Sequence, residues 1–360
     1  MGVRQWHGGP VAGTPQSQPA DLTAGSASFH AGGRTDDGFD QDRSPLYYLV
    51  AAIPAFVPAT WVRNVSYWKM LAATPYLFFG VMLGGSLWYV ARRLYGNAGG
   101  FVALTLYCFS PAMIVSVAGA GSLGEMGAVW GAFGTIWTGI AVAHTLYAPR
   151  EVVLWNWRRI VLLGLSITLA VGNQFSLVVL IVVALGLMLW AAPVRRGAVL
   201  TIWGASCGLA LLLLLAAYFF DLRLFWQGMN HAKWFNLDVA ALGVAVSYRH
   251  SLAEIFGGSP PLMLLLPGAL AAFAVWKRAR YFGNVAPLGI AVLLLAMGMA
   301  APGLPGQGFY LAASAFLFVF VAGVFVDLQE TRRGQWVTAA VTGLLIAGAC
   351  WNVLELIRAG

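Results

Sequence analysis

The chain has 360 residues, of which 60% are hydrophobic and only 9% are charged, and its formal net charge is +8. Soluble domains carry about 25% charged residues, so this composition excludes an ordinary soluble enzyme or binding domain. The basic residues stand in pairs between apolar segments, which is typical of loops that orient membrane helices and not of a nucleic-acid-binding patch. We therefore expect an integral membrane protein with cytoplasmic basic loops and no nucleic-acid partner.

Residues 1–44 are rich in small and polar residues and contain no apolar run. Such a composition cannot bury enough surface to offset chain entropy, so we expect a flexible polar tail. We expect residues 45–360 to form a single transmembrane domain. Its first apolar segment, Leu46–Trp61, is short and contains Pro54 and Pro58, which favours a helix along the external membrane surface over a span.

The rest of the chain predicts an all-α bundle of about ten transmembrane helices, each near bilayer length. The segment 160–190 would be about 46 Å long as a single helix, whereas the hydrocarbon core is about 30 Å thick. We therefore expect two short helices joined at Gly172-Asn173, with Asn173 at the outer surface. The expected apolar segments are Tyr67–Tyr89, Phe101–Val117, Met126–Leu146, Ile160–Trp190 as two helices, Leu200–Phe219, Leu262–Val275, Val285–Met299, Gly308–Val326 and Trp336–Leu356.

The longest polar stretch between the predicted spans covers residues 221–259 and is expected on the external side. It interleaves aromatic side chains with basic ones, which suits a lipid phosphate or a sugar. The same pattern equally suits an amphipathic helix at the membrane surface. The candidate substrate contacts in this loop are His231, Lys233, Trp234 and Arg249.

Acidic residues near the outer helix ends are candidates for chemistry. Glu125 stands where a helix begins, a place where the helix dipole favours a carboxylate, so it is either a capping acid or a substrate or metal contact. A cluster of acids precedes the expected surface helix, and such a cluster can bind a divalent cation, act as a base or merely be solvated. Its members are Asp36, Asp37, Asp40 and Asp42.

Several short stretches together resemble the GT-C superfamily of membrane glycosyltransferases. Arg43–Leu49 is similar to the His-Pro-Pro-Leu-Tyr-Tyr-Leu stretch of that family's external surface helix, and Ala91–Gly96 resembles its Ala-Arg-Arg-Leu-Phe-Gly cytoplasmic turn. Phe109-Ser110-Pro111 matches Leu-Ser-Pro. Gly172–Phe175 resembles the Thr-Lys-Phe hinge, and Gly308–Leu311 falls where many members have Arg-Tyr-Leu. The layout is also shared by bacterial membrane proteins, which implies a bacterial inner-membrane location.

The resemblance implies a GT-C-like fold that carries a polyprenyl-phosphate sugar, with an external acid that deprotonates the acceptor. It assigns the catalytic role to Asp40, Asp42 and Glu125, the last also as a contact for a divalent cation. It adds Tyr47, Tyr48 and Tyr310 to the substrate contacts named above. The implied partners are membrane lipids and the lipid-linked sugar.

Three departures keep a second hypothesis open. The family's first span is expected to be lacking, Arg43-Ser44 replaces His-Pro, and Phe309 stands where a basic residue would contact phosphate. A phenyl group cannot recognise phosphate in the bidentate way a guanidinium does. The alternative to an enzyme is therefore an inactive relative kept as a structural or accessory subunit among other membrane subunits. A transporter finds less support, because no inverted repeat is evident.

Overall fold

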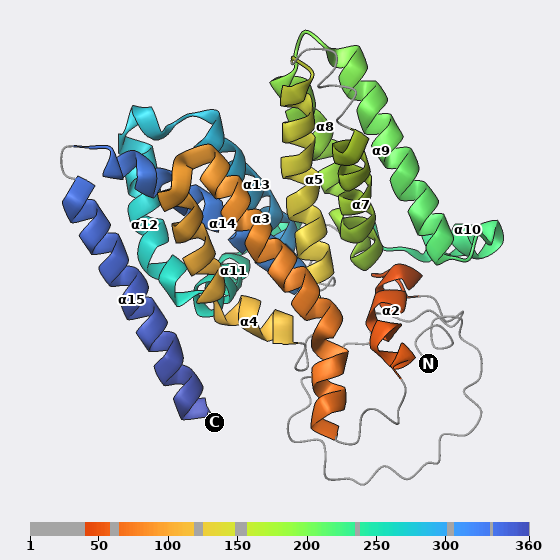
Figure 1. Cartoon of the computed structure of the whole chain (residues 1–360), viewed down its shortest axis with the longest axis horizontal. Coiled ribbons are helices and arrows are strands. Elements are labelled where there is room, and N and C mark those ends of the chain that lie inside the picture. Colours follow the sequence, from red (N-terminus) through yellow and green to blue (C-terminus); the bar gives the residue numbers. More distant parts are fainter. Residues whose placement is uncertain are drawn as a thin grey trace. The chain divides into compact units, whose positions relative to one another are not determined.

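The structure is a computed structural model that describes residues 40–57, 65–118, 125–147, 157–234, 238–300, 306–331 and 334–359. In these ranges the regular elements are all helices, without any strand, as predicted (Figure 1). Six of the described helices are long and apolar enough to cross a membrane, or seven if one bent pair counts as a span. The described part therefore has the make-up of a helical membrane protein, but not the predicted ten spans.

Contacts divide the chain into two compact units, although residues 45–360 were expected to form one domain. The first unit contains Met1–Phe78 and Gly119–Phe235, and the second contains Phe79–Ala118 and Asn236–Gly360.

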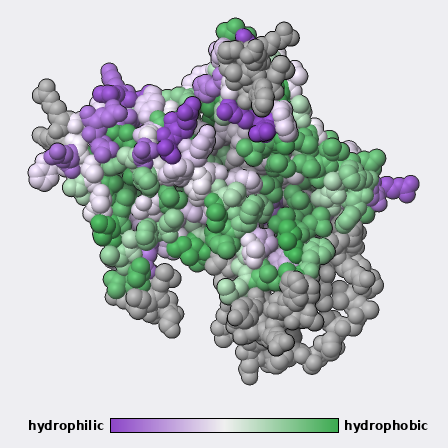
Figure 2. Space-filling model, in the orientation of Figure 1, coloured by the Kyte–Doolittle hydropathy of each residue, from purple (hydrophilic) through white to green (hydrophobic). Residues whose placement is uncertain are grey.

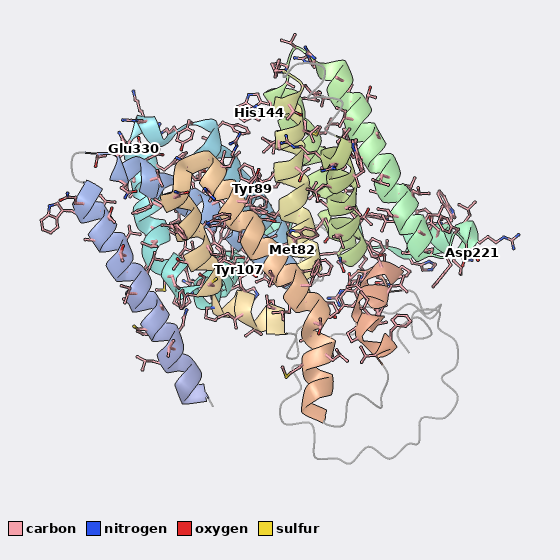
Figure 3. The ribbon with its side chains drawn as sticks, in the orientation of Figure 1. Met82, Tyr89, Tyr107, His144, Asp221 and Glu330 are labelled. Atoms are coloured by element: carbon pink, nitrogen blue, oxygen red, sulfur yellow. The ribbon has the colours of Figure 1, made fainter. Side chains whose placement is uncertain are left out.

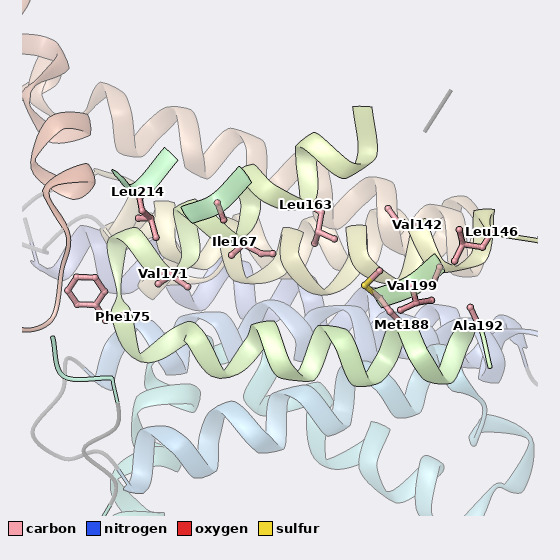
Figure 4. Packing of buried hydrophobic residues seen from close by; sticks show 12 residues of the cluster. Val142, Leu146, Leu163, Ile167, Val171, Phe175, Met188, Ala192, Val199 and Leu214 are labelled. Carbon is pink, nitrogen blue, oxygen red and sulfur yellow. The ribbon is translucent and has the colours of Figure 1, made fainter. Parts of the chain in front are cut away.

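The first unit is organised around α7, which packs against α5, α9 and the short helix α2. Leu163, Ile167 and Val171 follow one face of α7 at intervals of four residues and are fully or almost fully buried among side chains of α5, α8 and α9 (Figure 4). Its elements are α2 (Pro45–Ala52), η1 (Ile53–Phe56), α5 (Met126–Thr145), α7 (Trp157–Asn173), η3 (Phe175–Val178), α8 (Val179–Ala191), α9 (Arg196–Ala217) and α10 (Leu222–His231).

The predicted break after residue 172 is present, since α7 ends at Asn173 and Gln174 is extended before the short helix η3 begins. The expected surface position of Asn173 is wrong. Its side chain is buried, and its Nδ2 donates to the carbonyl oxygen of Leu169 at 2.7 Å. The reason is that residues 40–44 cover the break between α7 and η3.

The second unit is built around α14, which is almost entirely buried, whereas α15 buries only 11% of its apolar window. The helix α12 packs against both of them. The elements are α3 (Val65–Cys108, of which 65–78 belong to the first unit), α4 (Pro111–Ala118), η4 (Val239–Gly243), α11 (Ala245–Gly258), α12 (Pro260–Val275), η5 (Lys277–Ala279), α13 (Phe282–Ala300), α14 (Gly306–Gln329) and α15 (Gly334–Ala359).

The element α3 is a helical hairpin that turns at Gly96, whose φ of 80° favours glycine. Tyr107 donates its hydroxyl to the carbonyl oxygen of Gly80 at 2.7 Å. Twenty-seven residues of straight helix would separate these groups by about 40 Å, so the chain must fold back (Figures 1 and 3). The predicted segment Tyr67–Tyr89 lies in the first arm of this hairpin, whereas Phe101–Val117 covers the end of the second arm and most of the separate helix α4.

The polar stretch 221–259 is largely helical rather than an open loop. It contains α10, η4 and α11, and the division between the two units falls inside it. The helix α11 meets α12 at a bend of 117°. The predicted substrate contacts within the stretch 221–259 are therefore distributed over both units.

Gly131 brings α5 and α7 into backbone contact, because a Cβ atom there would lie 2.3 Å from the amide nitrogen of Ala170. We predict that Gly131→Ala lowers the free energy of unfolding by about 1–3 kcal/mol through overpacking. Gly139→Ala is the matched control in the same helix, since its Cβ would make ordinary contacts, with the flexible Met188 side chain at 3.4 Å and with Ala184 Cβ at 3.8 Å. Denaturant unfolding in detergent measures both, and equal stabilities would contradict this helix contact.

Candidate functional site

Residues 40–44 form a strap that crosses the break between α7 and η3. The amide and the hydroxyl of Ser44 both donate to the carbonyl oxygen of Gly172, at 2.9 and 2.7 Å. The amide of Phe175 donates to the carbonyl oxygen of Asp42 at 3.0 Å, and that of Lys233 donates to the carbonyl oxygen of Gln41 at 2.7 Å. The strap therefore joins the end of α7, the start of η3 and the segment after α10.

Helix ends explain why the strap lies here. The last four carbonyl groups of a helix have no partner within it, and a buried end must find one elsewhere. Ser44 supplies two donors to one such carbonyl, that of Gly172. A Cβ atom on residue 172 would lie 2.7 Å from Leu46 Cδ2 and 3.2 Å from Ser44 Oγ, so glycine permits this approach.

Asp40 is fixed by two hydrogen bonds. Tyr48 donates its hydroxyl to Asp40 Oδ2 at 2.5 Å, and the amide of Asp42 donates to Asp40 Oδ1 at 2.8 Å. Burial and the neighbouring Asp40 raise the pKa of the Tyr48 hydroxyl, which therefore stays protonated and donates. The strap thus presents a half-buried carboxylate with both oxygens engaged.

Asp42 is a buried carboxyl group with both cationic and anionic neighbours. Burial raises its pKa and the charge of Asp40 adds to this, while Lys233 and Arg43 act in the opposite direction. Asp42 Oδ1 is buried and accepts no hydrogen bond within the described residues. A buried acceptor without a partner costs free energy, so this atom is the clearest place for a ligand proton.

Arg43 is a buried cation of the strap whose charge acts on Glu125. Its guanidinium lies 4.4 Å from the ring centre of Tyr47, and its side chain is buried. Glu125 precedes the candidate span of α5 and is also buried. Burial raises the pKa of Glu125 to about 7, although the charge of Arg43 acts to lower it. The structure therefore brings Asp40, Asp42 and Glu125 into one unit with Arg43 and Lys233.

Two predicted substrate contacts at the end of α10, His231 and Trp234, interact with other parts of the first unit. His231 Nδ1 lies 2.8 Å from the carbonyl oxygen of Gln227 in its own helix. Trp234 donates to the carbonyl oxygen of Met229 at 3.0 Å and packs on Phe175, with 5.1 Å between the ring centres. Trp234 thus holds the segment that carries Lys233 against the start of η3.

The other two predicted contacts belong to the second unit. Arg249 is exposed on α11. Tyr310 is buried on α14, its hydroxyl lies 2.9 Å from Ser251 Oγ, and its ring packs edge-on against His250. Tyr310 therefore ties α11 to α14.

The predicted divalent-cation role of Glu125 finds no set of ligands. Among the described residues no three His, Cys, Asp or Glu side chains are grouped to hold a metal ion. Asp36 and Asp37 lie outside the described residues. The role of Glu125 in binding a divalent cation therefore stays a prediction.

Arg43 is the residue of this cluster that sequence reasoning missed, because it was noted only as a departure from a His-Pro pattern. The available signal was its position between Asp42 and the Ser44-Pro45 helix start. A cation next to an acid just before a helix begins can be buried together with that acid.

Comparison of the chain with protein-family models, with curated proteins and with solved structures finds no match. The interpretation of the cluster therefore rests on its geometry.

Glu125 makes stability depend on pH. Its pKa is raised from 4.5 to about 7 on folding, so the folded protein holds a proton that the unfolded chain releases between these values. Stability should therefore fall as pH rises from about 4.5 to 7 and level off above it. The raised pKa of Asp42 adds a loss of the same sign that begins at lower pH.

We predict that Glu125→Gln weakens this loss of stability, as measured by the melting temperature in detergent at pH 5, 6, 7 and 8. Glu254→Gln, at an exposed position on α11, is the control and should follow the unmodified protein. A pH profile left unchanged by Glu125→Gln would contradict the burial of this carboxyl group.

Proposed function

We propose that the chain is a GT-C-like membrane glycosyltransferase that uses a polyprenyl-phosphate sugar. The supporting observation is that acids and cations distant in the sequence converge in the first unit. Asp42 lies next to Arg43 in the strap and is influenced by the charge of Lys233, which follows α10, while Arg43 acts on Glu125 at the start of α5. Transfer of a sugar from a lipid phosphate to a hydroxyl group needs a base for the hydroxyl proton and positive charge for the departing phosphate. An acid beside two cations can supply both.

In this proposal Asp42 is the base. Its raised pKa makes its carboxylate a better proton acceptor near neutral pH, and its Oδ1 atom accepts no hydrogen bond from the residues that the structure describes. The proton of the acceptor hydroxyl passes to Asp42 as the acceptor oxygen bonds to the anomeric carbon of the sugar. The bond between that carbon and the phosphate oxygen breaks at the same time.

The two cations stabilise the departing lipid phosphate. Negative charge grows on the phosphate as it leaves, and preorganised cations close to it lower the barrier. Arg43 is held by the ring of Tyr47, and the backbone of Lys233 is held by Gln41, so both belong to the strap assembly. No step requires a metal ion.

A specific observation favours a second candidate, a non-catalytic subunit of a larger membrane assembly. Both oxygens of Asp40 are engaged by Tyr48 and by the strap itself. Arg43 packs on Tyr47, and its charge acts on both Asp42 and Glu125. Such a network can serve solely to fasten the strap to α5 and α7.

We predict that Asp42→Asn reduces the release of polyprenyl phosphate from a lipid-linked sugar by about 10²-fold, the scale of lost acid–base assistance. The assay uses protein in liposomes with a panel of polyprenyl-phosphate hexoses and pentoses. Asp221→Asn is the matched control, because Asp221 is an exposed acid that caps α10 and asparagine caps as well (Figure 3).

Melting temperatures separate the two candidates. Lost turnover in a variant that melts like the unmodified protein supports the enzyme. Unchanged turnover in Asp42→Asn would remove Asp42 from the mechanism. No turnover in the unmodified protein with any donor, together with a lowered melting temperature in Asp42→Asn, would favour the subunit.

A further inference from the structure

A groove of about 1000 Å³ lies between the end of α14 and the first three turns of α15. It belongs wholly to the second unit and is separate from the acid cluster. Its lining residues are Gln329, Thr331, Gly334, Gln335, Thr338, Ala339, Thr342, Gly343 and Ile346.

The groove changes character along its length. Amide and hydroxyl side chains line the end near Gln335 and Thr338, whereas the far end has one hydroxyl group, that of Thr342, beside Gly343 and the apolar Ile346. The twelve residues from Gln335 to Ile346 rise by about 16 Å, close to half the ~30 Å hydrocarbon core. Trp336 is 78% exposed at the polar end, where membrane proteins place tryptophan at the interface. The groove thus has a polar and an apolar part, arranged as in a lipid molecule.

Cations lie at the rim of the polar end. Arg278 of η5 forms an ion pair with Glu330 at 3.1 Å, and Glu330 stands between the lining residues Gln329 and Thr331. Lys277, beside Arg278, is exposed. Figure 2 shows hydrophilic residues gathered at the upper left, over this end of the unit, with hydrophobic residues below them. The rim is therefore suited to a negative headgroup.

We propose that this groove binds one anionic glycerophospholipid. Its phosphate lies at Arg278 and Lys277, the rest of the headgroup meets Gln335 and Thr338, and one acyl chain runs along Gly343 towards Ile346. Lipid is the expected neighbour because α15 is long enough to cross a bilayer and leaves most of its apolar surface uncovered. The hydroxyl of Thr338 donates to the carbonyl oxygen of Gly334, and its oxygen can still accept a hydrogen bond from a headgroup hydroxyl.

The experiment measures retention of dioleoylphosphatidylglycerol and dioleoylphosphatidylcholine by the full chain in detergent, using native mass spectrometry. Lys277→Gln with Arg278→Gln removes the rim cations. Arg195→Gln with Arg196→Gln is the control, an exposed basic pair at the start of α9. Gly343→Phe fills the groove, and Gly204→Phe on α9 is its control, because a Cβ atom meets nothing within 4 Å at either glycine.

Phosphatidylglycerol should bind more tightly than phosphatidylcholine. Each cation near a membrane surface contributes about 1 kcal/mol, so loss of both should weaken phosphatidylglycerol binding by at least about tenfold. Gly343→Phe should abolish the tight binding of one lipid, and neither control should change it. Glu330→Gln frees Arg278 and should strengthen binding of the anionic lipid.

Four outcomes would overturn the proposal. Equal retention of both lipids, or no effect of the rim variants, would show that the groove does not select negative charge. Unchanged lipid binding in Gly343→Phe would show that the groove is not the site, and a changed oligomeric state in that variant would assign it to a second copy of the chain. None of these results depends on glycosyl transfer.

Discussion

The first unit depends on one carbonyl group, that of Gly172 at the end of α7, which accepts two hydrogen bonds from Ser44. A helix end buried in a low-dielectric surrounding needs such donors, since a missing partner there costs about 1–3 kcal/mol. Ser44 also accepts a hydrogen bond from the amide of Leu46 and so begins α2. One side chain therefore ends one helix and starts another, which fixes the path of residues 40–44.

This path determines where the charges lie. Once Ser44 is fixed, the two residues before it are buried next to α7 and η3, and their charges must be balanced locally. Arg43 supplies a cation to Glu125 and Asp42, and Lys233 supplies another to Asp42. Burial still dominates, because the pKa values of both acids are raised. The cluster therefore holds weakly acidic carboxyl groups, which suits either proton transfer or a pH-dependent fastening of the strap.

The sequence predicted features governed by local rules. The length of the 160–190 segment required a break, and the basic pair Arg92-Arg93 marked the end of the first arm of α3, while the turn as far as Gly96 was expected only from a family resemblance. The grouping of Asp40, Asp42 and Glu125 followed only from a family pattern. The surface position of Asn173 and the ten spans were not found, because both depend on how distant segments pack. No periodicity reports that residues 40–44 cover the end of α7, so the burial of Arg43 and the structural use of Trp234 could not be predicted.

The central claim is that the strap brings the charge of Arg43 close enough to the buried Glu125 to act on it. A double-mutant cycle of Arg43→Gln and Glu125→Gln, read as free energies of unfolding in detergent at pH 8, tests it most directly. Neighbouring buried charges should couple, and the two changes should differ from additivity by about 1 kcal/mol or more. Additivity within about 0.5 kcal/mol, the behaviour of distant sites, would contradict the account.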